Sequence, residues 1–134
     1  MTYTIGQAST ASGISRKMIR YYEETGLLPP ARRSESGYRH YNDEDIRRLQ
    51  FIRRARDMGF SLERIGQLLN LWQNEQRHSA DVKALVQQYI DELDDNIAQM
   101  QAMRDELHDW VDHCHGDERS ECAIIEHLKP AHSN

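Results

Sequence analysis

The chain has 134 residues, of which 38% are hydrophobic and 29% charged, and its formal net charge is −5. This length suits one compact domain, or a small head with an extension. No apolar run approaches membrane-spanning length and the first residues lack a signal-peptide hydrophobic region, so we expect a cytoplasmic protein with no membrane contact.

The charge is unevenly distributed along the chain. Residues 1–77 hold 13 Lys/Arg and 9 Asp/Glu, whereas residues 78–134 hold 4 and 13. A basic front half on an acidic protein suits DNA binding, because phosphate contacts supply most of the non-specific affinity. The alternative is that the two halves of the chain have ordinary surfaces that merely differ in composition.

The first elements form a predicted helix-turn-helix. Thr4 can cap a short helix that ends near Ser12, and Ser15 can cap a second helix from Arg16 to about Glu24. A glycine-containing turn between two such helices is typical of DNA-binding heads. The second helix carries cationic and aromatic side chains that suit a major groove: Arg16, Lys17, Arg20, Tyr21 and Tyr22.

A hairpin is predicted next. Pro29 and Pro30 exclude a helix, and a Ser-Gly turn precedes the strand-like residues Tyr38 to Tyr41. This hairpin carries three arginines and two tyrosines, so we interpret it as the wing of a winged helix-turn-helix.

Two further helices complete the predicted head. Asn42, followed by three acidic residues, is a strong helix start, and Gly59 ends that helix. Ser61 can cap the next helix. The polar stretch 73–78 is interpreted as a hinge, which gives a predicted DNA-binding domain over residues 1–72.

A long helix is predicted after the hinge, from a cap at Ser79 to about Asp112. Its apolar residues alternate three and four positions apart, which is a heptad stripe. Such a helix cannot bury its stripe alone, so we expect a two-fold dimer, with packing on its own domain as the alternative. The stripe comprises Val86, Ile90, Leu93, Ile97, Met100, Arg104, Leu107 and Val111.

Residues 113–134 are predicted to form a loop and a short helix. Cys114 and Cys122 are the only cysteines, and Gly116 lets the backbone between them turn. Two thiols at this spacing can converge on a soft metal ion or form a disulfide, and a reducing cytoplasm favours metal or redox chemistry. Nearby acidic residues are expected to raise the thiol pKa.

The head resembles the MerR family of transcription regulators. The resemblance rests on the stretches Met18–Glu23, Gly26–Leu28 and Arg33–Tyr41. The opening of the long helix, the Cys114–Cys122 loop and Ile124-Ile125 are similar to the copper-responsive branch of that family. His115 is a departure, since those relatives often carry proline there.

This resemblance implies a mainly α-helical fold: a winged helix-turn-helix head, an antiparallel coiled-coil dimer, and a short C-terminal metal-binding loop. It also implies an activator that binds an inverted repeat in promoter DNA as a homodimer. The metal-bound form is expected to kink and undertwist that DNA so that RNA polymerase can use the promoter and copper efflux or detoxification genes are transcribed. The positions that match the DNA-contacting residues of the family are Lys17, Arg20, Tyr22, Arg33, Tyr38, Arg39, Tyr41 and Arg56.

The predicted metal ligands are Cys114 and Cys122. Two opposed thiolates give a linear site that suits Cu(I), Ag(I) or Au(I), one ion per loop. Relatives that bind divalent ions place a third cysteine where this chain has Ser79, which therefore favours a monovalent ion. Two thiolates and one monovalent ion leave a negative charge. The positive start of the long helix, with Lys83 one turn in, is expected to compensate that charge if the partner subunit brings this helix end to the site.

Several alternatives stay open. A Cys2His2 zinc site could use two of His113, His115 and His127, and a divalent Zn or Hg sensor or a thiol redox switch could have the same fold. A multidrug sensor would need a further domain. The chain has no base–nucleophile arrangement and no phosphate loop, so we do not expect an enzyme.

Overall fold

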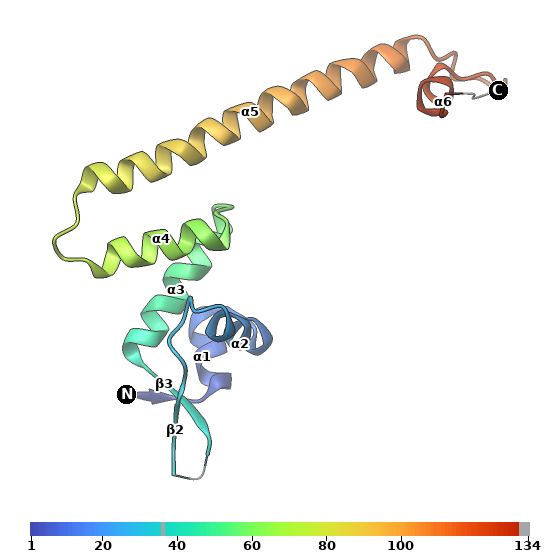
Figure 1. Cartoon of the computed structure of the whole chain (residues 1–134). Helices are drawn as coiled ribbons and strands as arrows, with labels where there is room; N and C mark the ends of the chain where they lie inside the picture. Colours follow the sequence, from blue (N-terminus) through green and yellow to red (C-terminus); the bar gives the residue numbers. More distant parts are fainter. Residues whose placement is uncertain (36, 132–134) are drawn as a thin grey trace. The chain divides into compact units, whose positions relative to one another are not determined.

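The computed structural model describes residues 1–35 and 37–131. The chain divides into two compact units, Met1–Leu85 and Val86–Asn134, and each is described by itself (Figure 1). The fold is mainly helical, as predicted. None of the helices in the described ranges is long and apolar enough to cross a membrane.

The first unit contains the small sheet and four complete helices. Its elements are β1 (Thr2–Tyr3), α1 (Ile5–Ser12), α2 (Arg16–Glu24), β2 (Arg32–Arg33), β3 (Arg39–Asn42), α3 (Asp43–Asp57) and α4 (Leu62–Gln73). The long helix α5 (Ser79–Asp112) begins in this unit and continues into the second, which also contains α6 (Ala123–Leu128).

Four of the predicted helix caps are confirmed. Thr4, Ser15, Asn42 and Ser61 each accept a hydrogen bond from the backbone N–H three residues later. The predicted cap of α5 is wrong, because that helix begins at Ser79 itself. Ser79 is therefore the first helical residue.

The sheet has the order β1-β3-β2 and is antiparallel throughout. Arg33 pairs with Arg39 in the hairpin, and Gly37 adopts a left-handed conformation, with a φ of 84°, at its tip. This confirms the predicted hairpin. The pairing of Tyr3 with Tyr41 was not predicted, since β1 is too short for a sequence pattern.

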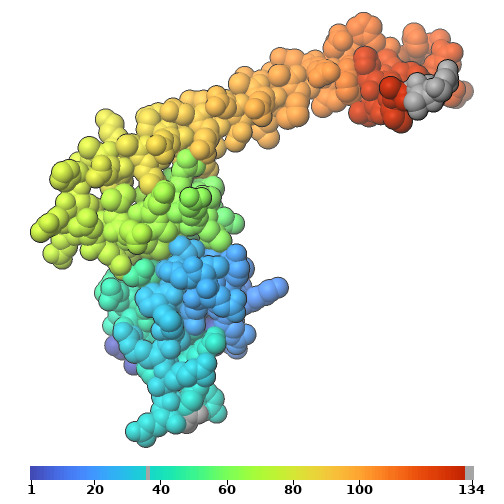
Figure 2. All heavy atoms as spheres, in the orientation of Figure 1, coloured from blue at the N-terminus to red at the C-terminus, as the bar shows by residue number. Residues whose placement is uncertain are grey.

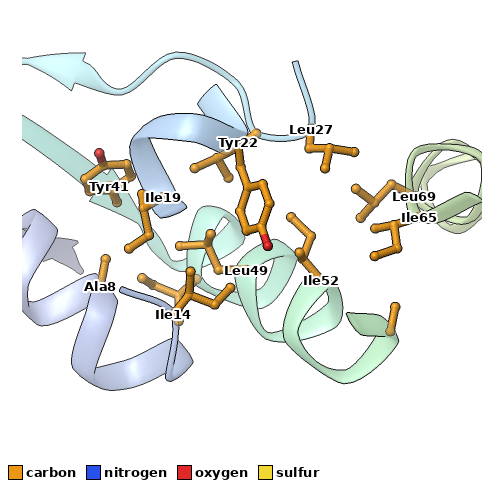
Figure 3. Close-up of a cluster of buried hydrophobic side chains, with 13 residues drawn as sticks. Ala8, Ile14, Ile19, Tyr22, Leu27, Tyr41, Leu49, Ile52, Ile65 and Leu69 are labelled. Atoms are coloured by element: carbon orange, nitrogen blue, oxygen red, sulfur yellow. The ribbon is translucent and has the colours of Figure 1, made fainter. Parts of the chain in front are cut away.

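The hydrophobic core lies entirely in the first unit. Its buried members come from α1, α2, β3, α3 and α4, and from the segments that connect them; Figure 3 shows Ile14, Ile19 and Leu49 among them. In contrast, α5 has no buried residue. The head thus has a core of its own, whereas the long helix leaves its apolar stripe uncovered.

Candidate DNA interface and metal centre

The outer face of α2 presents cations without partners. Ile19 and Tyr22 point into the core (Figure 3), and this leaves Lys17 and Arg20 exposed. Neither cation forms a hydrogen bond or ion pair with any residue in the described ranges 1–35 and 37–131. Unpaired cations on a second helix suit contacts to phosphates and base edges.

Two of the tyrosines predicted to contact DNA lie in the core instead. Tyr41 is fully buried, and its hydroxyl donates a hydrogen bond to Glu23 Oε1. Tyr22 is only 4% exposed. A DNA contact through the Tyr41 side chain does not fit this placement, because strand β3 turns it inward.

Glu23 links Tyr41 to the wing. Its second oxygen, Oε2, lies 3.8 Å from Nη1 of Arg39, and the Glu23 side chain is only 10% exposed. Burial, together with the hydrogen bond to Glu23, raises the pKa of Tyr41 above its ordinary value. This network fixes the base of the wing against α2.

The remaining wing residues are exposed. Tyr38 is 75% exposed, and Arg33 Nη1 lies 3.5 Å from the carbonyl oxygen of Gly37. The hairpin projects from the rest of its unit in Figure 2, where its residues are cyan. Arg56, also exposed, donates to the carbonyl of Phe60 at 3.3 Å, beyond the end of α3.

The two cysteines of the second unit face each other. Their Sγ atoms lie 3.5 Å apart and both side chains are half-buried. A disulfide would need about 2.05 Å, so both thiols are free. Gly116, with a φ of 67°, provides the left-handed turn that brings the loop back.

The first turn of α6 lowers the pKa of the Cys122 thiol. The backbone N–H of Ile125 is the main cause, followed by the Cys114 thiol and the N–H of Ile124. The expectation that acidic neighbours would raise the pKa is wrong for Cys122, because these donors stabilise its thiolate. A thiolate is the form that binds a soft metal.

Two nearby histidines have other partners. His113 Nδ1 lies 2.7 Å from the carbonyl oxygen of Asp109, and this contact raises the His113 pKa. The His127 ring stacks on Trp110 with centroids 4.8 Å apart. Over residues 1–35 and 37–131, no cluster of three or more His, Cys, Asp or Glu side chains could hold an ion.

The sulfur pair fits a soft ion with a small adjustment. At roughly 2.3 Å per metal–sulfur bond, the zinc value, a linear site needs about 4.6 Å between sulfurs and a tetrahedral site about 3.8 Å. The loop therefore has to open by about 1 Å for linear binding. Among the described residues no third donor joins the two thiols, and such a pair favours low coordination.

Residues 3–72 match the MerR HTH family of regulatory proteins, and residues 46–110 match the MerR DNA-binding family. The chain belongs to the MerR family. It is therefore a DNA-binding transcription regulator and not an enzyme, as the sequence analysis expected. The winged head described above is the MerR head.

Similar proteins cover almost the whole MerR chain. Heavy metal-dependent transcription regulator 2 of Rhizobium meliloti is 53% identical over 92% of this chain and 84% of its own. CueR of Escherichia coli is 42% identical over 92% of each chain. The structure of PbrR691 from Ralstonia metallidurans in complex with lead(II) has a TM-score of 0.84 at 33% identity, and the match covers 95% of this chain and 99% of that one.

Two parts of these sites were not predicted from the sequence. Glu23 was not singled out, although it joins Tyr41 to Arg39. The stack of Trp110 on His127 was missed as well. Neither has a local signal, since both bring together residues at least 16 positions apart in the sequence.

Proposed function

We propose that this MerR protein is a cytoplasmic, dimeric activator that responds to a monovalent coinage metal, Cu(I), Ag(I) or Au(I). Residues 1–72 bind promoter DNA, 73–78 form a hinge, 79–112 dimerise and 113–134 hold the metal. The observation that carries the proposal is the pair of free, half-buried sulfurs 3.5 Å apart. The similarity to CueR and to heavy metal-dependent regulators supports metal sensing.

In this proposal the metal-bound dimer distorts an inverted repeat so that RNA polymerase can start transcription. The exposed cations Lys17, Arg20 and Arg33 hold the DNA together with the half-buried Arg39, and Arg56 is a further phosphate contact. Tyr38 supplies a hydroxyl from the wing. The buried Tyr22 and Tyr41 shape this surface from beneath.

The charge of a monovalent site can be balanced by the start of α5. Two thiolates and one monovalent ion carry a net charge of −1, which is costly to bury without a compensating group. The positive end of α5 can compensate it, with Ser79 in the first turn and Lys83 one turn on. The 34 residues of α5 separate its own start from Cys114 by roughly 50 Å, so the partner subunit has to supply that end.

Competition between the protein and a Cu(I) chelator under reductant tests the metal. We expect tight Cu(I) binding that Cys114→Ser and Cys122→Ser each weaken by at least about a hundredfold, since one thiolate is lost. Ser120→Ala, in the same loop, is the matched control and should bind normally. Tighter binding of Zn(II) than of Cu(I) would contradict the proposal.

Metal selectivity tests the role of Ser79. We expect Ser79→Cys to extend the transcriptional response to Zn(II) or Hg(II), because a third thiolate suits ions of higher coordination number. A reporter gene under a responsive promoter measures this. An unchanged metal preference would count against the monovalent assignment.

Divalent sensing is the second candidate. The sulfur separation of 3.5 Å is nearer to that of a tetrahedral site, and PbrR691 was crystallised with lead(II). A thiol redox switch is the third, and the lowered pKa of Cys122 favours it. Loss of free thiols on adding metal under reductant supports metal binding, whereas loss only with oxidant supports the switch.

A further inference from the structure

Arg16, at the start of α2, has an unusual position against α1. A Cβ atom built on Gly6 would lie 2.7 Å from Arg16 Nη2, 3.2 Å from Cζ and 3.6 Å from Nε. The Arg16 guanidinium therefore occupies the space that a side chain at position 6, in the first turn of α1, would need. Any larger residue at position 6 would displace it.

Arg16 has no partner in this position. It is exposed and forms no hydrogen bond or ion pair within the described ranges. Many other arginines of the same unit do have partners, for example Arg32 with Asp45 and Arg53 with Asp57. All five guanidinium N–H groups of Arg16 are thus available to a ligand.

The groove in front of Arg16 is open, and no acidic residue lines it. It has a volume of about 550 Å³ and lies along α1 and the N-terminal strand. Its lining includes Thr4, Gln7 and Thr10, which are neutral, and two cations, Arg16 and the N-terminal ammonium of Met1. The ammonium is paired with Asp43 at 3.2 Å, so Arg16 is the cation of this lining without a partner in the described ranges. Such a groove suits an anion.

The helix-turn-helix geometry identifies the anion. In this motif the second helix enters the major groove while the first helix crosses the DNA backbone. Arg16 starts on the second helix but reaches back over the first, so its guanidinium faces the strand that α1 crosses. We propose that Arg16 binds a DNA phosphate there and that Gly6 is required to leave room for it.

This proposal adds a contact to the DNA surface and does not depend on the metal. A phosphate contact is independent of sequence, so a DNA duplex of random sequence is a sufficient probe. The full-length, metal-free protein is titrated with it at several salt concentrations. Loss of one phosphate contact lowers the slope of log K against log salt by about 0.9.

We expect Arg16→Ala to lower that slope by about 0.9 and to weaken binding roughly five- to tenfold at moderate salt. Arg119→Ala, which removes the same charge from the Cys114–Cys122 loop, is the control and should leave the slope unchanged. An unchanged slope for Arg16→Ala would overturn the proposal.

Gly6→Ala tests the role of the glycine. Alanine favours a helix more than glycine does, and the atom it meets is the mobile end of a side chain, so α1 should remain folded. Thermal unfolding by circular dichroism checks this. We expect Gly6→Ala to weaken DNA binding in the wild-type background and to have no further effect in the Arg16→Ala background. Equal effects in both backgrounds would show that Gly6 acts independently of Arg16 and would refute its proposed role.

Discussion

At the scale of single residues, Tyr41 connects the core of the head to the wing. It is buried beneath the wing and donates to Glu23, whose other oxygen faces Arg39. The Glu23 carboxylate, only 10% exposed, therefore joins α2 to the wing. A change at this point is expected to affect both elements of the proposed DNA surface at once.

Tyr41→Phe is expected to destabilise the head by about 2 kcal/mol at neutral pH, because it removes a hydrogen bond to a charged, buried partner. Its effect depends on pH. The raised pKa of Tyr41 means that the folded state keeps its proton while the unfolded state loses it above about pH 10. The difference in unfolding free energy between wild type and Tyr41→Phe should therefore shrink above about pH 10.

Urea denaturation at neutral and alkaline pH measures this difference. Tyr38→Phe is the matched control, since that hydroxyl lies on an exposed ring. It should change stability little at either pH. A cost of Tyr41→Phe that stays constant with pH would contradict the proposed linkage.

At the scale of single elements, a ring stack joins α6 to the end of α5. The His127 ring lies parallel to Trp110, within 4°, near the end of α5. Since Cys122 precedes α6 directly, this stack also helps to place its sulfur near Cys114. The stack therefore contributes to the shape of the Cys114–Cys122 loop without belonging to the proposed ligands.

His127→Ala is expected to loosen α6 and to make trypsin cleave after Arg119 roughly fivefold faster, because a stacked aromatic pair contributes about 1 kcal/mol. His127→Phe keeps a ring and should preserve the wild-type rate. His115→Ala, in the exposed loop, is the control. Equal cleavage rates for His127→Ala and wild type would mean that the stack does not hold α6.

The helix caps and the extent of α5 were predictable from local sequence signals. Thr4, Ser15, Asn42 and Ser61 were recognised as caps because a capping side chain bonds within its own turn. The heptad pattern likewise predicted α5 up to its last residue, Asp112.

What the sequence did not reveal depends on contacts between distant residues. Strand β1 has two residues and exists only because Tyr3 pairs with Tyr41. The burial of Tyr41 depends on that same pairing and on Glu23 of α2. In the metal loop the two sulfurs were identified from spacing, whereas the donors that lower the Cys122 pKa depend on where α6 begins.

At the scale of the whole molecule, the exposed stripe of α5 requires a partner. Ile97 is 51% exposed and Leu107 equally so, although both are strongly apolar. Exposed apolar residues in a heptad repeat are typical of a coiled coil before association. The proposed dimer would cover them.

Ile97→Lys is expected to convert the dimer into monomers, because it places a charge in the middle of the stripe. Analytical ultracentrifugation measures the change. Gln99→Lys introduces the same charge away from the stripe and should remain dimeric. If Ile97→Lys also sedimented as a dimer, the stripe would not be the interface.

The lack of any buried residue in α5 has a consequence for how the protein is made. In the proposed dimer, this 34-residue helix without a core of its own would gain its stability from pairing, and its melting temperature would rise with total protein concentration. The head can fold on a freshly synthesised chain. The cysteine loop, which follows that helix, would become able to bind its ion only after two chains have dimerised. At low protein concentration, subunits would therefore bind DNA before they could respond to an ion.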